Sequence, residues 1–414
     1  MTRTENKSRL EVGSLLTALG ISSMGDFIYL VAINVFVYRL TDSAIAVAGL
    51  WMIGPLASVM TKFWIGSIVD RSSLKNIMVW TDVIRGGLLI VIPFMESLWL
   101  LYGSLYLLAV AKSFFEVASF SYIAKWIPTT KRKQFNAYRQ AITSGAFLIG
   151  PALSGALLLV TTTDVAIWMN SVSFFMSALL LQRLPQLEWK RTTFTNRMTT
   201  QMIRTDWKEV WRFSQSNGFV FYMYMLFQGM MILSFAMDAQ EVVFTQETLS
   251  LSEAQYGLLI SLTGLSAVVG SLVVASATRF LSIRWLIGVG SVLVAVGYMI
   301  YALSHSFWMT LVGFLILGFF NAFSGSGFIT FYQNNLPEEM TGRIASVYGM
   351  VQSILQVIGV LLLGLLSDIV ELRITLLFAA SFILLLSMIQ FYFVFRSSSA
   401  TYYSESDQPI KNIS

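Results

Sequence analysis

Residues 306–337 read SFWMTLVGFLILGFFNAFSGSGFITFYQNNLP, and no side chain in this stretch is charged. A bilayer core of about 30 Å is crossed by roughly 20 apolar residues in an α-helix. In lipid only a helix pairs its own backbone groups, because an open strand would leave N–H and C=O groups without partners. This stretch therefore predicts a helix that crosses a membrane.

Eleven further stretches are long and apolar enough to cross a membrane, some without any charged residue and others with one or a few. Those preceding it are residues 14–37, 43–66, 76–95, 98–122, 140–163, 165–182, 213–237, 254–278 and 285–304. Those following it are residues 344–367 and 374–395. The sequence thus predicts an all-α integral membrane protein with twelve transmembrane helices.

Composition supports this class and excludes others. Hydrophobic residues make up 56% of the chain and charged residues 12%, whereas a soluble domain carries about 25% charged residues. There is no cysteine, and His305 is the only histidine, so we expect no metal, no cofactor and no enzymatic activity. No G-x-x-x-x-G-K-[ST] sequence is present for an ATP-driven pump. The net charge of +5 is not a nucleic-acid signal, because the basic residues lie in the connections.

The distribution of Lys and Arg predicts the orientation. Most of the 27 basic residues fall in the N-terminus, the even-to-odd connections and the C-terminus, and only Arg39 and Arg373 lie on the opposite side. This bias places both termini in the cytoplasm of a multi-pass cell-membrane protein. The polar first 13 residues lack the apolar stretch of a signal peptide. We predict a six-helix bundle over residues 1–185, a basic cytoplasmic linker over 186–214, and a second six-helix bundle with a short cytoplasmic tail over 215–414.

The two predicted halves are related by an internal repeat. Gly150 and Gly155 follow Pro128 at the same spacings at which Gly359 and Gly364 follow Pro337. Each series begins at an equivalent junction of loop and helix. Duplicated six-helix bundles around a site at the bilayer midplane are a transporter architecture.

The chain resembles the major facilitator superfamily, and within it the macrolide-efflux and enterobactin-exporter type of permease. The segments that carry the likeness are Ser22-Ser23-Met24-Gly25-Asp26, Gly66-Ser67-Ile68-Val69-Asp70-Arg71, Asp82-Val83-Ile84-Arg85, Gly150-Pro151 and Pro337-Glu338-Glu339-Met340-Thr341-Gly342-Arg343. The resemblance implies two pseudo-symmetric six-helix bundles that line a central cavity with their first and fourth helices. The second copy of the loop segment is degraded, with Ala275 and Arg279 at the positions of Gly66 and Asp70.

The loop that begins at Gly66 is the first candidate functional segment. Asp70 could accept hydrogen bonds from the N-terminus of a neighbouring helix, or it could pair with a basic residue such as Arg85. The resemblance implies a conformational latch on the cytoplasmic side. Its candidate residues are Gly66, Asp70, Arg71, Lys75, Asp82 and Arg85. The alternative is a solvated turn whose basic residues only fix the topology.

The fifth predicted helix carries small residues that suit close helix packing in lipid. They are Gly145, Gly150, Pro151 and Gly155. Pro151 would also bend the helix, because it lacks a backbone N–H. The resemblance associates this pattern with exporters, while the alternative is packing without directional meaning.

Charged residues inside the spans are the candidates for ion coupling. Asp26 lies near the midplane, about 18 Å along its helix, where an unpaired carboxylate is costly. A carboxyl group there could take up and release protons, or it could be a fixed packing acid. Lys112 and Glu116 lie one helical turn apart and could form a pair that protonation opens. Lys62 could instead be the partner of Glu116.

Other polar residues are weaker candidates. Asp238 and Glu241 end the seventh span as an outer gate, an ion entry or a solvated helix end. The candidates for orienting a substrate in the cavity are Asn34, Gln228, Asn321 and Gln333.

These observations predict a monomeric secondary active transporter that exports a small, apolar or amphipathic molecule by proton-coupled alternating access. Its partners would be that molecule, protons and membrane lipid. The alternatives are a proton-coupled importer, a metabolite or siderophore exporter of the same fold, and, more remotely, a receptor or scaffold that does not transport.

Overall fold

A computed structural model describes residues 3–187 and 200–404 of the chain. Within these ranges, twelve helices are long and apolar enough to cross a membrane, which confirms the predicted spans. The last ten residues and part of the predicted linker lie outside the described residues.

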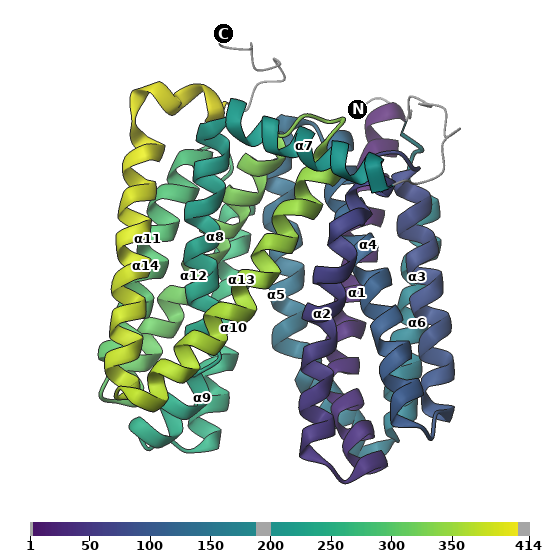
Figure 1. Ribbon diagram of the computed structural model, residues 1–414, viewed down its shortest axis with the longest axis vertical. Coiled ribbons are helices and arrows are strands. Elements are labelled where there is room, and N and C mark those ends of the chain that lie inside the picture. Colours follow the sequence, from purple (N-terminus) through teal and green to yellow (C-terminus); the bar gives the residue numbers. More distant parts are fainter. Residues whose placement is uncertain (1–2, 188–199, 405–414) are drawn as a thin grey trace. The chain divides into compact units, whose positions relative to one another are not determined.

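Apart from α6 and α7, successive helices are joined by short connections (Figure 1). In the first half of the chain they are α1 (Arg3–Thr41), α2 (Ala44–Val69), α3 (Leu74–Val91), α4 (Leu98–Trp126), α5 (Thr129–Val160) and α6 (Thr163–Gln182). In the second half the membrane-crossing helices are α8 (Gly218–Asp238), α10 (Glu253–Ser276), α11 (Ile283–Leu303), α12 (Phe307–Asn335), α13 (Thr341–Ile369) and α14 (Leu372–Phe395). The shorter elements are α7 (Thr200–Ser216), α9 (Glu241–Val243) and the turns η1 (Ile92–Phe94), η2 (Phe244–Thr248) and η3 (Ser397–Tyr403).

Local sequence sets where these helices begin. Serine side chains accept hydrogen bonds from the first-turn N–H groups of several helices, which would otherwise lack partners. These N-caps are Ser43, Ser73, Ser252, Ser282 and Ser306. Between α1 and α2 the chain reverses at Asp42, whose φ of 48° is a left-handed conformation that aspartate tolerates.

The helices form two compact units that do not follow the order of the sequence. The first unit contains Met1–Trp126, Gly145–Trp211 and Pro337–Ser353, and the second contains Ile127–Ser144, Arg212–Leu336 and Ile354–Ser414. The start of α13 therefore packs in the first unit, and the start of α5 packs in the second. The predicted division at residues 186–214 stays a prediction.

Corresponding helices pack in the same way in both units. In the first unit α1 and α3 contact α6, and α2 and α3 contact α4. In the second unit α8 and α11 contact α14, and α10 and α11 contact α12. These are the same four pairs if α8 corresponds to α1 and the later spans follow in order. The packing thus has the pseudo-symmetry that the internal repeat predicts.

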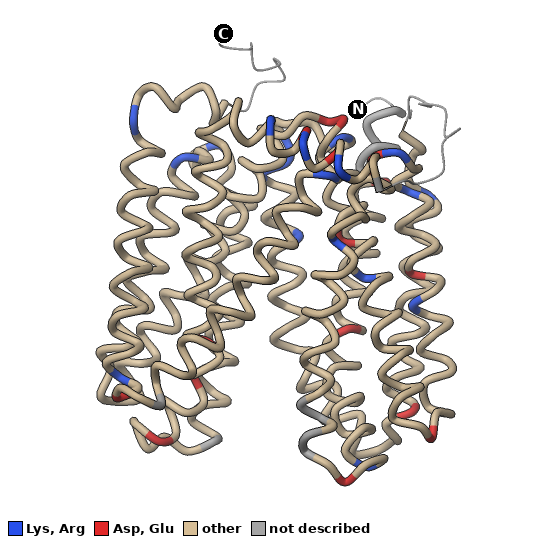
Figure 2. Tube along the Cα trace, viewed as in Figure 1, with Lys and Arg blue, Asp and Glu red and all other residues tan. Residues whose placement is uncertain are grey.

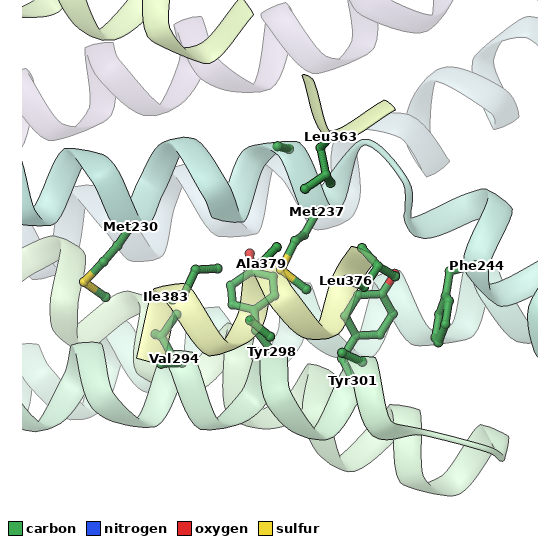
Figure 3. Close-up of a cluster of buried hydrophobic side chains, with 14 of the residues drawn as sticks. Met230, Met237, Phe244, Val294, Tyr298, Tyr301, Leu363, Leu376, Ala379 and Ile383 are labelled. Carbon is green, nitrogen blue, oxygen red and sulfur yellow. The ribbon is translucent and has the colours of Figure 1, made fainter. Parts of the chain in front are cut away.

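Each unit has its own buried apolar core. In the first unit Ile28, Leu89 and Phe174 belong to a cluster from α1, α3 and α6 that α4 completes. In the second unit (Figure 3) Met237 of α8 and Tyr298 of α11 lie beside residues of α14. These cores hold the helices that carry the polar residues described next.

Candidate functional site

A cluster of four charged side chains lies at the middle of the first unit's spans. Asp26 stands near the centre of the 32-residue span Leu10–Thr41. Its carboxylate accepts hydrogen bonds from Arg85 at 3.0 and 3.1 Å and lies 3.6 Å from the ammonium group of Lys112. Arg85 also binds Asp82 at 3.2 Å. We call Asp26, Asp82, Arg85 and Lys112 the midspan cluster; its two acids and two bases balance in charge.

The packing of α1 against α6 positions Asp26. A Cβ atom at Gly25 would lie 2.2 Å from both Asn170 and Ser173 of α6, so only glycine permits this approach. The guanidinium of Arg85 lies 3.7 Å from the ring centroid of Phe174, also on α6, where a cation is stabilised by the aromatic face. Arg85 is therefore fixed from two sides.

The most exposed member of the midspan cluster is Lys112. Its side chain is 50% exposed, whereas that of Arg85 is 2% exposed. The predicted pairing of Lys112 with Glu116 is not what the structure has, because Lys112 reaches across to α1. Glu116 pairs instead with Lys62 of α2 at 3.8 Å, as the alternative prediction allowed. The sequence placed these residues on the same helix face but did not fix which neighbour each one reaches.

A second cluster surrounds the loop between α2 and α3. Asp70 accepts hydrogen bonds from the backbone N–H groups of Gly342 at 2.7 Å and Arg343 at 2.9 Å, and from Nε of Arg343 at 3.2 Å. These N–H groups belong to the first turn of α13, which favours a negative charge. Both kinds of partner considered for Asp70 are present, a helix N-terminus and a basic residue, but the basic residue is Arg343. Arg85 binds Asp26 and Asp82 instead.

Glycine is required where α2 meets the start of α13. A Cβ atom at Gly66 would lie 2.6 Å from the Cα of Arg343 and 2.6 Å from the carbonyl oxygen of Gly342. Both contacts are with backbone, which cannot move aside alone. The N–H of Gly66 also donates to the hydroxyl of Ser346 at 3.2 Å. The close approach predicted at Gly66 thus brings two backbones together.

Helix α7 contributes acids to this cluster that the sequence did not identify. Asp206 accepts two hydrogen bonds from Arg71, both at 2.7 Å, and one from Arg343 at 3.0 Å. Glu209 also binds Arg343. We call Asp70, Arg71, Asp206, Glu209 and Arg343 the loop cluster. A signal was present in the four-residue spacing of Asp206, Val210 and Ser214, but the many charges nearby favoured reading the segment as a loop.

The acids of the loop cluster differ in protonation behaviour. Burial raises the pKa of the Asp70 carboxyl above its usual range, although the N–H groups of Arg343 and Gly342 oppose the rise. Burial would also raise the pKa of Asp206, but hydrogen bonds from Arg71 and Ser67 and the nearby guanidinium charges outweigh it and hold that pKa below its usual range. Asp206 is therefore a firmly ionised link between two arginines.

Other predicted residues of the loop have separate contacts. The ammonium group of Lys75 donates to the carbonyl oxygens of Gln182 and Leu184, both at 2.7 Å. It therefore caps the end of α6, whose last carbonyls lack partners in the helix. Asp82 and Arg85, which the resemblance grouped with the loop, lie in the midspan cluster.

The small residues of α5 do not all make close contacts. A Cβ atom at Gly150 would lie 2.4 Å from the Cβ of Phe27 on α1, whereas one at Gly155 would meet no atom within 4 Å. Gly145 begins the part of α5 that belongs to the first unit, and Pro151 lies within the helix. The packing function is thus visible at Gly150.

The four residues proposed to orient a substrate have different surroundings. Asn34 donates to Leu30 of its own helix at 2.6 Å, and Asn321 is exposed. Gln228 is buried, and its side-chain oxygen has no hydrogen-bond partner among the described residues. Gln333 is buried and accepts from Asn136 at 2.9 Å, so it joins α12 to the start of α5.

Asp238 is the last residue of α8, and Glu241 is the first residue of α9. Tyr298 of α11 donates its hydroxyl to Asp238 at 2.9 Å. Partial burial and the charge of Asp238 raise the pKa of Glu241 above its usual range.

Comparison with a family model covers most of the chain. A family model described as Major Facilitator Superfamily matches residues 15–245 and 236–410. A Bacillus subtilis protein described as an uncharacterized MFS-type transporter, YfiS, is 26% identical over 174 residues, which are 42% of each chain. The putative bacilysin exporter BacE of Bacillus amyloliquefaciens is 27% identical over 178 residues, 41% of this chain and 43% of that protein. Each similarity thus spans less than half of the relative's length.

Solved structures share the fold at low sequence identity. The human organic anion transporter MFSD10 matches with a TM-score of 0.75 and 13% identity over 93% of this chain and 99% of that one. A bacterial homologue of the iron transporter ferroportin matches with a TM-score of 0.70 and 17% identity over 94% and 99%. At such identities the likeness is one of fold.

Proposed function

Because the chain belongs to the major facilitator superfamily, we propose that it is a secondary active exporter that moves a small apolar or amphipathic molecule out of the cell in exchange for protons. The midspan cluster carries this proposal. It holds a carboxylate at the middle of a span, beside one fixed cation and one half-exposed cation. Ionisable groups at this depth are costly and are retained mainly for function.

Proton uptake at Asp26 would compete with Lys112. A proton on the carboxylate removes its attraction for the ammonium group, while Arg85 stays in place because Asp82 and Phe174 also hold it. The next acid within reach of Lys112 is Glu116, one turn along the same helix. Protonation thus breaks a link between α1 and α4, and release of the proton restores it.

The loop cluster serves as the conformational latch in this proposal. It ties the loop between α2 and α3 to the first turn of α13 through Asp70 and Arg343. It also ties both to α7 through Asp206. Alternating access requires two conformations of comparable free energy, and charged contacts that form in one of them set the balance.

The direction of transport rests on two observations. The similar protein BacE is described as a putative exporter, and the Gly150-Pro151 segment of α5 resembles that of exporters. The substrate proposed is apolar or amphipathic because the midspan cluster is neutral overall. Import with protons is the competing possibility, and the sign of the substrate flux separates the two.

Transport assays test the proposal. A panel of toxic compounds, scored for tolerance on overexpression and deletion, selects a substrate. In inside-out vesicles the wild type should take up this substrate when a proton gradient is applied. Asp26→Asn should reduce the gradient-dependent uptake to background while the protein stays in the membrane. The matched control is Asp42→Asn, which removes a carboxylate from the α1–α2 turn and should transport normally. Undiminished gradient dependence in Asp26→Asn would falsify the coupling proposal.

A further inference from the structure

The neighbours of helix α7 indicate that it lies at the level of the membrane surface. It ends at Ser216, and the membrane-crossing helix α8 begins at Gly218. Helix α7 also contacts α2: Trp207 donates its indole N–H to the carbonyl oxygen of Phe63 at 3.1 Å. Phe63 lies within the span Gly49–Val69. A helix fixed beside the last turns of a span and directly before the next span lies at headgroup depth.

One face of α7 is turned into the protein. Asp206, Val210 and Ser214 are 3%, 2% and 6% exposed, and their spacing of four residues puts them on one side of the helix. Asp206 binds Arg71 and Arg343 through this face.

The opposite face is basic and exposed. Arg204, Lys208 and Arg212 follow one another at intervals of four residues, and all three are exposed. Trp211, which is 62% exposed, lies among them. Within the part of the chain that the structure describes, none of these three cations has an ion-pair partner. Figure 2 shows basic residues gathered around this end of the first unit.

We propose that this exposed face, formed by Arg204, Lys208, Trp211 and Arg212, binds the headgroups of anionic phospholipids and thereby stabilises the loop cluster. Basic side chains with an interfacial tryptophan match an anionic lipid surface in charge and depth. Each basic residue near such a surface contributes about fivefold to binding. Lipid held on one face keeps Asp206 on the other face against its two arginines.

The effect of lipid on conformation follows from linkage. A ligand shifts an equilibrium only if it binds one conformation more tightly. When the start of α13 leaves, Arg343 leaves Asp206, and α7 loses contacts that orient its basic face. Anionic lipid should therefore favour the conformation in which the loop cluster is closed. The link from lipid to latch rests on the proposed function, whereas the binding of lipid does not.

The experiment uses the full chain in nanodiscs, without substrate or proton gradient. Spin labels on Asn76→Cys and Glu338→Cys report the distance across the loop cluster; the chain has no native cysteine. Replacing a quarter of the phosphatidylcholine by phosphatidylglycerol should raise the closed fraction of the wild type severalfold, and high salt should reverse this. The triple variant R204Q/K208Q/R212Q should not respond. The control R183Q/K131Q/R279Q, with the same loss of charge, should respond as the wild type does.

A second variant separates lipid binding from the effect of lipid on the loop cluster. Asp206→Asn should still bind, as measured by quenching of Trp211 fluorescence by brominated phosphatidylglycerol against a Trp211→Phe background. Its label distance should no longer depend on lipid. An unchanged response in the basic-face triple variant overturns the proposal, and so does an equal response to inorganic phosphate in phosphatidylcholine discs. Failure of export in vesicles with a normal lipid response would reject the proposed function alone.

Discussion

Gly66→Ala should open the loop cluster without removing any of its charges. The new Cβ atom would lie 2.6 Å from two backbone atoms of the first turn of α13, and 2.7 Å from the Cβ of Ser346. Because backbone cannot rotate away, α13 must shift outward from α2. Overpacking of this kind costs about 1–3 kcal/mol, which corresponds to about a 5- to 150-fold loss in the ratio of closed to open conformations.

Spin labels on Asn76→Cys and Glu338→Cys would measure this ratio in nanodiscs. The matched control is Gly54→Ala on the same helix, where a Cβ atom meets nothing within 4 Å. The control should keep the wild-type distance distribution, and Gly66→Ala should shift it toward longer distances and lower the turnover. If both variants give the same distribution, the close approach of the two backbones does not set the conformational balance.

Two further variants test packing and charge elsewhere. Gly150→Ala should lower the free energy of unfolding in detergent by about 1–3 kcal/mol, because its Cβ atom would lie 2.4 Å from that of Phe27. The control Gly155→Ala should be neutral or slightly stabilising. Equal losses in the two variants would contradict this prediction. Partial burial raises the pKa of Glu241 in the folded state, so the stability this group contributes is present below its unfolded pKa and is lost as the pH rises through the folded pKa. Glu241→Gln should therefore match the wild type at about pH 4 and melt at a higher temperature at about pH 8, and a constant difference across that range would refute the assignment.

The spans could be predicted because their signal is local. Twenty apolar residues in a row have few alternatives to a membrane-crossing helix, and Asp26 could be placed at midspan by counting residues. The close approach at Gly66 was also foreseeable, since glycine beside a helix end commonly allows close packing.

The partners of the charged residues could not be predicted in the same way. Lys112 could reach Glu116 on its own helix, but its actual partner Asp26 is on α1. The choice depends on the distance between helices, which residue spacing does not contain. Asp206 was missed because its helix is mostly polar, and its buried face is only one residue wide per turn. Asp206 can be recognised as a link only in the structure, where it binds both Arg71 and Arg343, which are far apart in the chain.

The start of α5 packs in the second unit and the start of α13 packs in the first. This arrangement constrains the order in which the protein can fold during synthesis. The first unit includes Pro337–Ser353, so it cannot be complete when the ribosome has delivered only the first six spans. Until that segment emerges, Asp70 has no helix terminus to bind, and the surface around Gly66 stays uncovered. Assembly must therefore wait for nearly the whole polypeptide. A protein cut between α6 and α8 should regain its structure only if both fragments are produced together.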